Sequence, residues 1–190
     1  MELLIAGAVV LLLLFWVVAM YNGLITKRNR VREAFSQIDV QLKRRSSLIP
    51  NLIETVKGYV KHEKEVLTEV TKARTALMNA HTPGAQAAAN SQLTGALNGL
   101  FAVAENYPQL KANENFLKLQ TRITELEERI ADRREFFNDD VNTYNTRIGQ
   151  IPDVFVASFM DLKRREMFKV SEQDRRQVEV NFHDHGAARA

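Results

Sequence analysis

Residues 31–77 read VREAFSQIDVQLKRRSSLIPNLIETVKGYVKHEKEVLTEVTKARTAL and carry the longest regular pattern in the chain. Positions spaced alternately by four and three residues form a stripe with two charges: Val31, Phe35, Ile38, Leu42, Arg45, Ile49, Leu52, Val56, Tyr59, Glu63, Val66, Val70, Ala73 and Leu77. Such a stripe is typical of an amphipathic helix that packs lengthwise on other helices. It predicts one very long helix over residues 26–80, kinked but not broken at Pro50, because the stripe keeps its phase past the proline.

The composition favours a helical protein without cysteine chemistry. The 190 residues include four prolines and eight glycines, which suits long helices. The absence of cysteine excludes disulfides, thiolate metal ligands and a cysteine nucleophile. A formal net charge of +3 is too small to indicate nucleic-acid binding.

An uncharged run, Leu3–Met20, precedes the stripe and reads LLIAGAVVLLLLFWVVAM. About 20 apolar residues cross a bilayer core, and the residues up to Ile25 extend the run to that length. A cleaved signal peptide normally has a basic start and a small-residue cleavage site. Because neither is present, residues 1–25 are predicted to be a retained transmembrane anchor.

A basic segment follows the anchor directly. Seven basic residues lie between positions 27 and 45: Lys27, Arg28, Arg30, Arg32, Lys43, Arg44 and Arg45. With Glu33 and Asp39 the segment carries +5, which leaves −2 for the remainder. The positive-inside rule then predicts an external N-terminus and a cytoplasmic domain. Attraction to anionic headgroups is the preferred role of the segment.

Three further helices are predicted after the first. A turn at residues 81–84 precedes a helix over residues 85–106, and Pro108 opens another over residues 108–149. A fourth helix is predicted over residues 153–168, followed by a largely irregular tail over residues 171–190. Short turns imply antiparallel neighbours, so residues 26–170 are predicted to form an all-α, antiparallel up-and-down four-helix bundle.

Several segments together resemble the LemA family of bacterial membrane-anchored proteins. They are Tyr21–Asn22, Arg28–Asn29, Ser36–Arg45, Leu48–Leu52, Val56–Tyr59, His62–Glu63, Ala104–Pro108, Leu110–Asn113 and Tyr144–Asn145. Phe35 stands where the family usually has a tryptophan-like residue and keeps the position aromatic. The resemblance implies a small external N-terminus, one span of the bacterial inner membrane and a cytoplasmic helical bundle. It implies no established catalytic activity.

The sequence offers no specific catalytic, cofactor or metal signature. No histidine follows a glutamate by three residues, as di-iron bundles require, and no phosphate loop or nucleophile elbow is present. The pair His183 and His185 has metal-ligand spacing, but lies in the predicted tail. Six polar residues are instead predicted to form capping or register-setting contacts in the bundle: Asn51, Glu63, Glu105, Asn106, Asn113 and Asn145.

The two charges in the stripe lead to a specific expectation. Arg45 is expected to be at least partly open near the membrane end, and Glu63 is expected to be buried and hydrogen-bonded between helices.

Three functional hypotheses follow. The leading one is a non-enzymatic, membrane-anchored scaffold or adaptor that presents its bundle to other proteins. The alternative is an envelope-stress or membrane-associated regulator that acts through the basic segment or a neighbouring membrane protease. An enzyme of unknown type ranks third. The partner and the oligomeric state, including self-association, stay open.

Overall fold

The computed structural model describes residues 1–60 and 63–168. The predicted tail over residues 171–190 lies outside these described residues. The described residues form helices and no strand, which confirms the all-α class. The helices are α1 (Glu2–Lys57), α2 (Lys64–Met78), α3 (Pro83–Ala104), α4 (Pro108–Lys111), α5 (Glu114–Arg147) and α6 (Asp153–Phe159).

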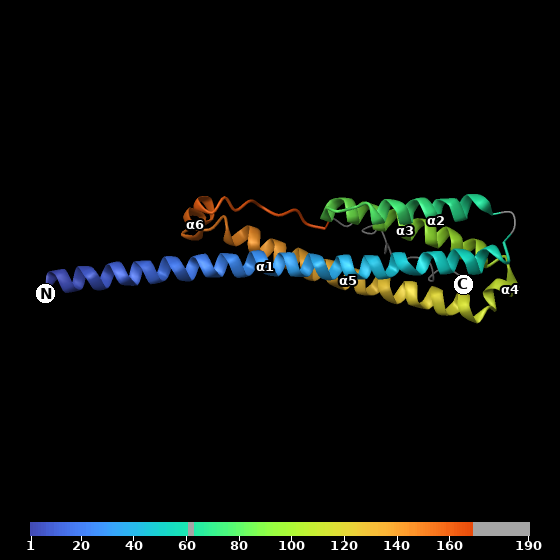
Figure 1. The fold of residues 1–190 in the computed structure, drawn as a ribbon, viewed down its shortest axis with the longest axis horizontal. Helices are drawn as coiled ribbons and strands as arrows, with labels where there is room; N and C mark the ends of the chain where they lie inside the picture. The colour runs from blue at the N-terminus through green and yellow to red at the C-terminus, as the bar shows by residue number, and fades with distance from the viewer. Residues whose placement is uncertain (61–62, 169–190) are drawn as a thin grey trace, which may run out of the picture.

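The N-terminal part of α1 extends alone, and the other elements gather along its C-terminal part (Figure 1). There α5 runs antiparallel to α1 and packs lengthwise on it, while α2 and α3 form a hairpin along the same stretch. The short α6 lies beside α1 where the free part begins (Figure 1). Every residue before Met20 is exposed, so α1 begins to pack at Met20 and Leu24.

The stripe on α1 is the packing face that the sequence predicts. The buried members on this helix are Val31, Ile38, Leu42, Arg45, Ile49, Leu52 and Val56. Facing it, α5 buries Phe116, Ile123, Leu126, Ile130, Phe137, Val141 and Tyr144. The rings of Phe35 and Phe137 meet across this interface with centroids 5.7 Å apart.

The expected single helix over residues 26–80 is wrong, because α1 ends at Lys57 and α2 begins at Lys64. Gly58 follows the last turn of α1, and glycine weakens a helix interior through its backbone entropy. The chain then reverses, so that α2 buries Val70, Ala73 and Leu77 against the rest of the fold. The stripe continues in phase because both helices turn the same face to one core.

Pro50 lies inside α1 without ending it. A proline at this position removes the backbone donor that would bond to the carbonyl four residues earlier, which is that of Ser46. Arg74 on α2 supplies the donor instead, since its Nε lies 3.0 Å from the Ser46 oxygen. The helix therefore continues past the proline, as the sequence predicts, and a side chain from the neighbouring helix satisfies the carbonyl that the proline leaves free.

The predicted helix over residues 153–168 is also shorter than expected, since α6 ends at Phe159. Residues 162–168, here called the strap, have no helical structure and run back from α6 toward the start of α3 (Figure 1).

Two asparagines of α5 fix the strap. The Asn145 amide donates to the Arg165 carbonyl at 2.9 Å and accepts from the Arg165 N–H at 2.8 Å. Asn138 makes the same pair of bonds with Phe168, at 3.1 and 2.8 Å. These amides satisfy the backbone N–H and carbonyl groups of Arg165 and Phe168, which in a helix would be satisfied by the strap itself.

Candidate functional site

Arg45 is the most deeply buried charge of the described residues, with an exposed fraction of 0%. Its Nη1 donates to Asn90 Oδ1 at 2.7 Å and to Thr94 Oγ1 at 3.0 Å. Its Nη2 lies 3.2 Å from Glu127 Oε2. The Thr94 hydroxyl in turn donates to Glu127 Oε1 at 2.7 Å. These four residues, here called the arginine clamp, join α1, α3 and α5.

The helices position each member of the clamp. Asn90 and Thr94 are four residues apart on α3, so they share one face. The same helix is rich in alanine and buries Ala87, Ala89 and Ala96. Small side chains leave room for the long arginine side chain between the helices.

Electrostatics make the clamp a matched unit. Burial lowers the pKa of the Arg45 guanidinium from its ordinary value, and the Glu127 carboxylate opposes that shift. Arginine nevertheless stays charged in proteins, so the pair remains ionic. The Glu127 side chain is 39% exposed, so the clamp reaches solvent on its α5 side.

The clamp fits a structural role better than a catalytic one. The only hydroxyl in it, that of Thr94, accepts from Arg45 and donates to Glu127, and the Glu127 carboxylate is itself paired with the guanidinium, so these groups satisfy one another. Instead, the guanidinium binds one amide, one hydroxyl and one carboxylate on two other helices. This fixes the register of the three helices against each other.

The expectation for the two stripe charges is wrong in both parts. Arg45 is buried, whereas Glu63 is only half-buried at the start of α2, and its side chain forms no hydrogen bond to a described residue. The reason is that α2 folds back after Lys57, so the stretch with Glu63 becomes a turn at the end of the fold. Arg45, at the middle of the packed part of α1, faces both α3 and α5.

Sequence reasoning missed the partners Asn90, Thr94 and Glu127. The signal for the first two is their spacing of four on a helix of small residues, opposite an arginine in an apolar stripe. Glu127 gave no separate signal, because it lies within a run of charged residues on α5.

The seven basic residues predicted near the membrane have different environments. Lys43 pairs with Asp39 at 2.7 Å, one turn away on α1. Arg30, Arg32 and Arg44 are exposed, whereas Lys27 and Arg28 are half-buried. Together with the buried Arg45, they do not form one surface.

The six predicted polar residues lie in separate places. Asn113 caps α5 by accepting from the Phe116 N–H at 3.0 Å, and donates to the Tyr59 hydroxyl at 2.9 Å. Glu105 forms an ion pair with Lys111. Asn145 binds the strap, as described above. Asn51 and Asn106 are exposed, and Glu63 is half-buried.

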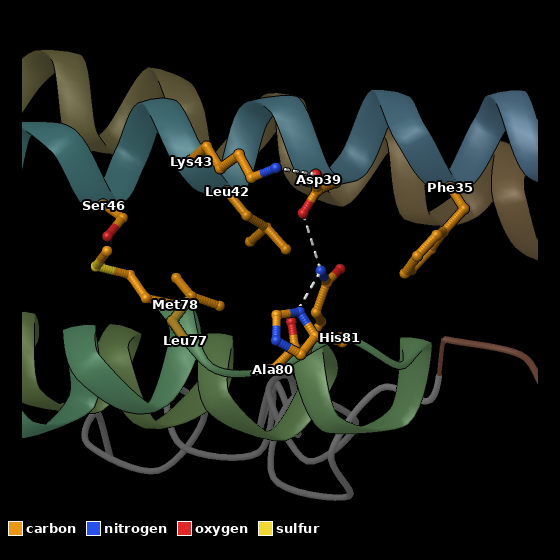
Figure 2. A pocket seen from close by; sticks show the side chains of 10 residues that line it. Phe35, Asp39, Leu42, Lys43, Ser46, Leu77, Met78, Ala80 and His81 are labelled. Atoms are coloured by element: carbon orange, nitrogen blue, oxygen red, sulfur yellow. Dashed lines mark hydrogen bonds and ion pairs between the residues drawn. The ribbon is translucent and has the colours of Figure 1, made fainter.

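A small cavity of about 280 Å³ lies between α1 and the turn that joins α2 to α3 (Figure 2). The buried Gln86 closes one side, donating to Asp39 Oδ1 at 3.1 Å and to the Ala80 carbonyl at 3.2 Å. Met78 and His81 come from the same side, and Phe35, Asp39 and Lys43 of α1 lie opposite them (Figure 2). These bonds tie the turn to α1.

The described residues contain no group of three or more histidine, aspartate or glutamate side chains placed to share a metal ion. The candidate ligands His183 and His185 lie outside the described residues.

The fold and the clamp define a helical protein in which one N-terminal helix is long and apolar enough, by length and composition, to cross a membrane. The family model for the LemA family matches residues 34–182. The chain therefore belongs to the LemA family, which confirms the resemblance seen in the sequence.

Individual relatives are similar over most of the chain. Protein LemA of Metamycoplasma hominis is 29% identical over 164 residues, which cover 84% of this chain and 74% of that protein. Magnetosome protein MamQ 2 of Paramagnetospirillum magneticum is 26% identical over 175 residues. Magnetosome protein MamQ of Magnetospirillum gryphiswaldense is 25% identical over 174 residues. Each magnetosome alignment covers 78% of this chain and 64% of the relative, so the chain spans just under two thirds of those proteins. The apolar helix and these relatives fit a single-pass membrane protein.

Proposed function

We propose that this chain is a non-enzymatic scaffold that holds a rigid helical surface at a fixed height above a bacterial inner membrane. The observation that carries the proposal is the continuity of α1, which has 56 residues and passes without interruption from an exposed apolar run into a buried packing face. A single helix that both anchors and packs transmits its orientation to everything built on it.

The packed part of the fold supports this rigidity. An antiparallel, up-and-down four-helix bundle of α1, α2, α3 and α5 is the proposed architecture, in place of the arrangement predicted from the sequence. The arginine clamp ties three of its helices together, and Arg74 ties the fourth to α1. From Ile25 to Lys57, α1 rises by about 48 Å, so the far end of the bundle stands well away from the bilayer.

The proposed partner surface is the far end, where α4 connects α3 to α5 (Figure 1). Leu117 is 44% exposed near the start of α5. Tyr59 is also exposed, and its hydrogen bond from Asn113 places it at the same end of the fold. The magnetosome relatives are named for an organelle, which is compatible with a scaffold at a membrane. No such organelle follows for this chain.

The opposite end of the bundle is proposed to rest on the bilayer. On α6, Phe155 is 69% exposed and Phe159 is 94% exposed. Ile151, in the turn that precedes α6, is 79% exposed. This apolar tip lies beside α1 where its free, apolar part begins, so it is continuous with the anchor. Apolar side chains at this place find hydrocarbon, which lowers their free energy. The proposed topology has the N-terminus outside and the bundle in the cytoplasm.

Partner capture tests the proposal. The full chain carries a photo-crosslinking amino acid in place of Leu117 in living cells, and a matched version carries it in place of Phe136, which is exposed on the middle of α5. We expect one or more defined protein adducts from position 117 and fewer from position 136. Equal, diffuse labelling at both positions would contradict a partner surface at the far end.

A further inference from the structure

We infer that the membrane end of the fold contains a binding site for a phosphate-type anion, formed by four arginines that have no carboxylate partner within residues 1–60 and 63–168. The site is a cavity of about 380 Å³, within the range of roughly 300–1,000 Å³ that small-molecule sites occupy. Its basic lining residues are Arg28, Arg32, Arg164 and Arg165. Below, this is called the four-arginine cavity.

The cavity forms where four elements meet. Arg28 and Arg32 lie on successive turns of α1, and Arg164 and Arg165 come from the strap. Thr82 and Pro83 add the start of α3, and Phe137 of α5 lies in the wall. The strap arginines are more than 130 positions away in the sequence, and the bonds between Asn145 and the Arg165 backbone hold them there.

The charges in the cavity are unbalanced. Among its lining residues, four guanidinium groups face one carboxylate, that of Glu166, which gives +3. Within residues 1–60 and 63–168, no ion pair joins any of the four arginines to a carboxylate. In addition, the Arg28 Nε is buried and has no hydrogen-bond acceptor in the part of the chain that the structure describes. Like charges held together cost free energy, and an anion bound among them removes that cost.

The position of the Glu166 carboxylate indicates that the four-arginine cavity attracts anions. A Cβ added to Gly84 would lie 2.9 Å from Glu166 Oε1, so this carboxylate rests on the first turn of α3. The N-terminal end of a helix carries partial positive charge and favours anions. Glu166 therefore occupies one edge of the cavity, and the four guanidinium groups remain for a second, more highly charged anion.

A phosphate group fits these donors best. Arginine binds phosphate through two parallel N–H···O bonds, and several arginines together favour a dianion over a carboxylate. The group has two natural sources, a phospholipid headgroup and a soluble phosphate compound. Arg28 and Arg32 follow Ile25 by three and seven residues, or about 5 and 10 Å along α1. This is the depth of the headgroup layer if the anchor ends near Ile25.

The inference rests on the proposed anchoring of the bundle, but its test does not depend on a protein partner. The full chain is placed in nanodiscs of phosphatidylcholine, and the unfolding of the bundle is followed by circular dichroism. One arm adds inorganic phosphate, with sodium chloride at equal ionic strength as the reference. The other arm replaces part of the phosphatidylcholine by phosphatidylglycerol. We expect Tm to rise by about 5–11 °C when the anion is roughly 100-fold above its Kd.

Two double variants separate the cavity from general attraction to a charged surface. Arg164→Gln with Arg165→Gln removes two charges from the cavity. Arg30→Gln with Lys163→Gln removes two exposed charges at the same end of the fold, outside the cavity lining. We expect the first variant to lose the rise in Tm and the second to keep it.

A single variant keeps the test decisive if the cavity variant fails to fold. Glu166→Gln removes the competing carboxylate and should lower the Kd for the anion several-fold. A response to phosphate alone assigns the site to a soluble compound, a response to phosphatidylglycerol alone assigns it to a headgroup, and both responses assign it to phosphate in either form. The inference is overturned if neither arm raises Tm, if both double variants respond alike, or if Glu166→Gln leaves the Kd unchanged. These outcomes are independent of partner capture at position 117, so this inference and the proposed scaffold function can fail separately.

Discussion

Arginines of the same helix, α1, meet two opposite environments within a few turns. Arg45 is fully buried and bonded to Asn90, Thr94 and Glu127. Arg28 and Arg32, nearer the membrane end, line a cavity with two more arginines and have no carboxylate partner among the described residues. The two sites have the same kind of side chain on the same helix, and differ in whether the fold supplies the counter-charge.

That difference separates a structural charge from a binding charge. A buried arginine with a complete set of acceptors is fixed by the fold, and removing it leaves those acceptors unsatisfied. Arginines gathered without acceptors contribute little to folding, or oppose it, and gain their acceptors from outside. Changes in the clamp should therefore act on stability, and changes in the cavity should act on the response to anions.

The largest effect is expected from Arg45→Ala in the arginine clamp. Removing one member of a buried ion pair costs about 3–5 kcal/mol. Because Glu127 is 39% exposed and can regain water, we expect the lower end, about 3 kcal/mol. For a chain of this size that is roughly 6–12 °C in Tm. The measurement is thermal unfolding of the full chain in nanodiscs.

The neighbouring Arg44 gives the matched control, since it is exposed on the same turn of α1. Arg44→Ala should change the stability by less than about 0.5 kcal/mol. If both substitutions had the same small effect, the clamp would not be a stabilising unit, and the contrast with the cavity would disappear.

A smaller effect is expected from Asn145→Ala, which releases the strap. The substitution removes both bonds to the Arg165 backbone, at a cost of about 1–2 kcal/mol that falls mainly on the strap. Hydrogen exchange should become faster at the Arg165 amide while the helices around the clamp keep their protection. The rise in Tm with anions should also shrink, because the strap carries two of the cavity arginines.

Asn142→Ala is the control, since Asn142 is exposed on the same helix. It should leave both the exchange rates and the anion response as they are. Loss of protection throughout α5 in the Asn145 variant would show that the strap and the clamp belong to one cooperative unit.

These residues also show what the sequence could predict. The four-and-three stripe on α1 and its counterpart on α5 were predictable, because burial along a helix leaves a periodic record. The turn after Lys57 was not, because α2 keeps the same phase and periodicity does not record a reversal of direction. The strap was missed because its stability comes from Asn138 and Asn145, which lie on another element. The partners of Arg45 were missed for the same reason, since pairing between distant helices leaves no local pattern.

Pro50 and Arg74 offer an intermediate case, an arginine that binds a backbone carbonyl. Arg74→Met removes the donor to the Ser46 oxygen and should cost about 1 kcal/mol. In the background of Pro50→Ala the cost should nearly vanish, because the new N–H at position 50 supplies the donor within α1. A double-mutant cycle by chemical unfolding measures this coupling. Equal costs of Arg74→Met in both backgrounds would mean that the carbonyl does not depend on Arg74.

The smallest effect on stability is expected at the apolar tip of α6. Phe159 is 94% exposed, so the packing within the bundle that Phe159→Asp removes should be worth less than about 0.5 kcal/mol, apart from its contact with the bilayer. The environment of the side chain at position 159, water or lipid, can be measured directly with a label. The chain has no cysteine, so Phe159→Cys can carry a fluorescent label at one position only. Leu117→Cys, at the far end of the bundle, gives the matched label in water.

The two labels test whether the four-arginine cavity lies at headgroup depth. If α6 rests in the bilayer, lipids brominated in their acyl chains should quench the label at position 159 and leave the label at position 117 unaffected. Iodide in solution should do the reverse. Because α6 and the cavity arginines are held to the same part of α1, insertion of the tip would place the guanidinium groups among lipid phosphates. Quenching of both labels by iodide would instead show that α6 lies in water, clear of the membrane. The anion in the cavity would then have to come from solution, and the unmatched arginines would serve a soluble phosphate compound.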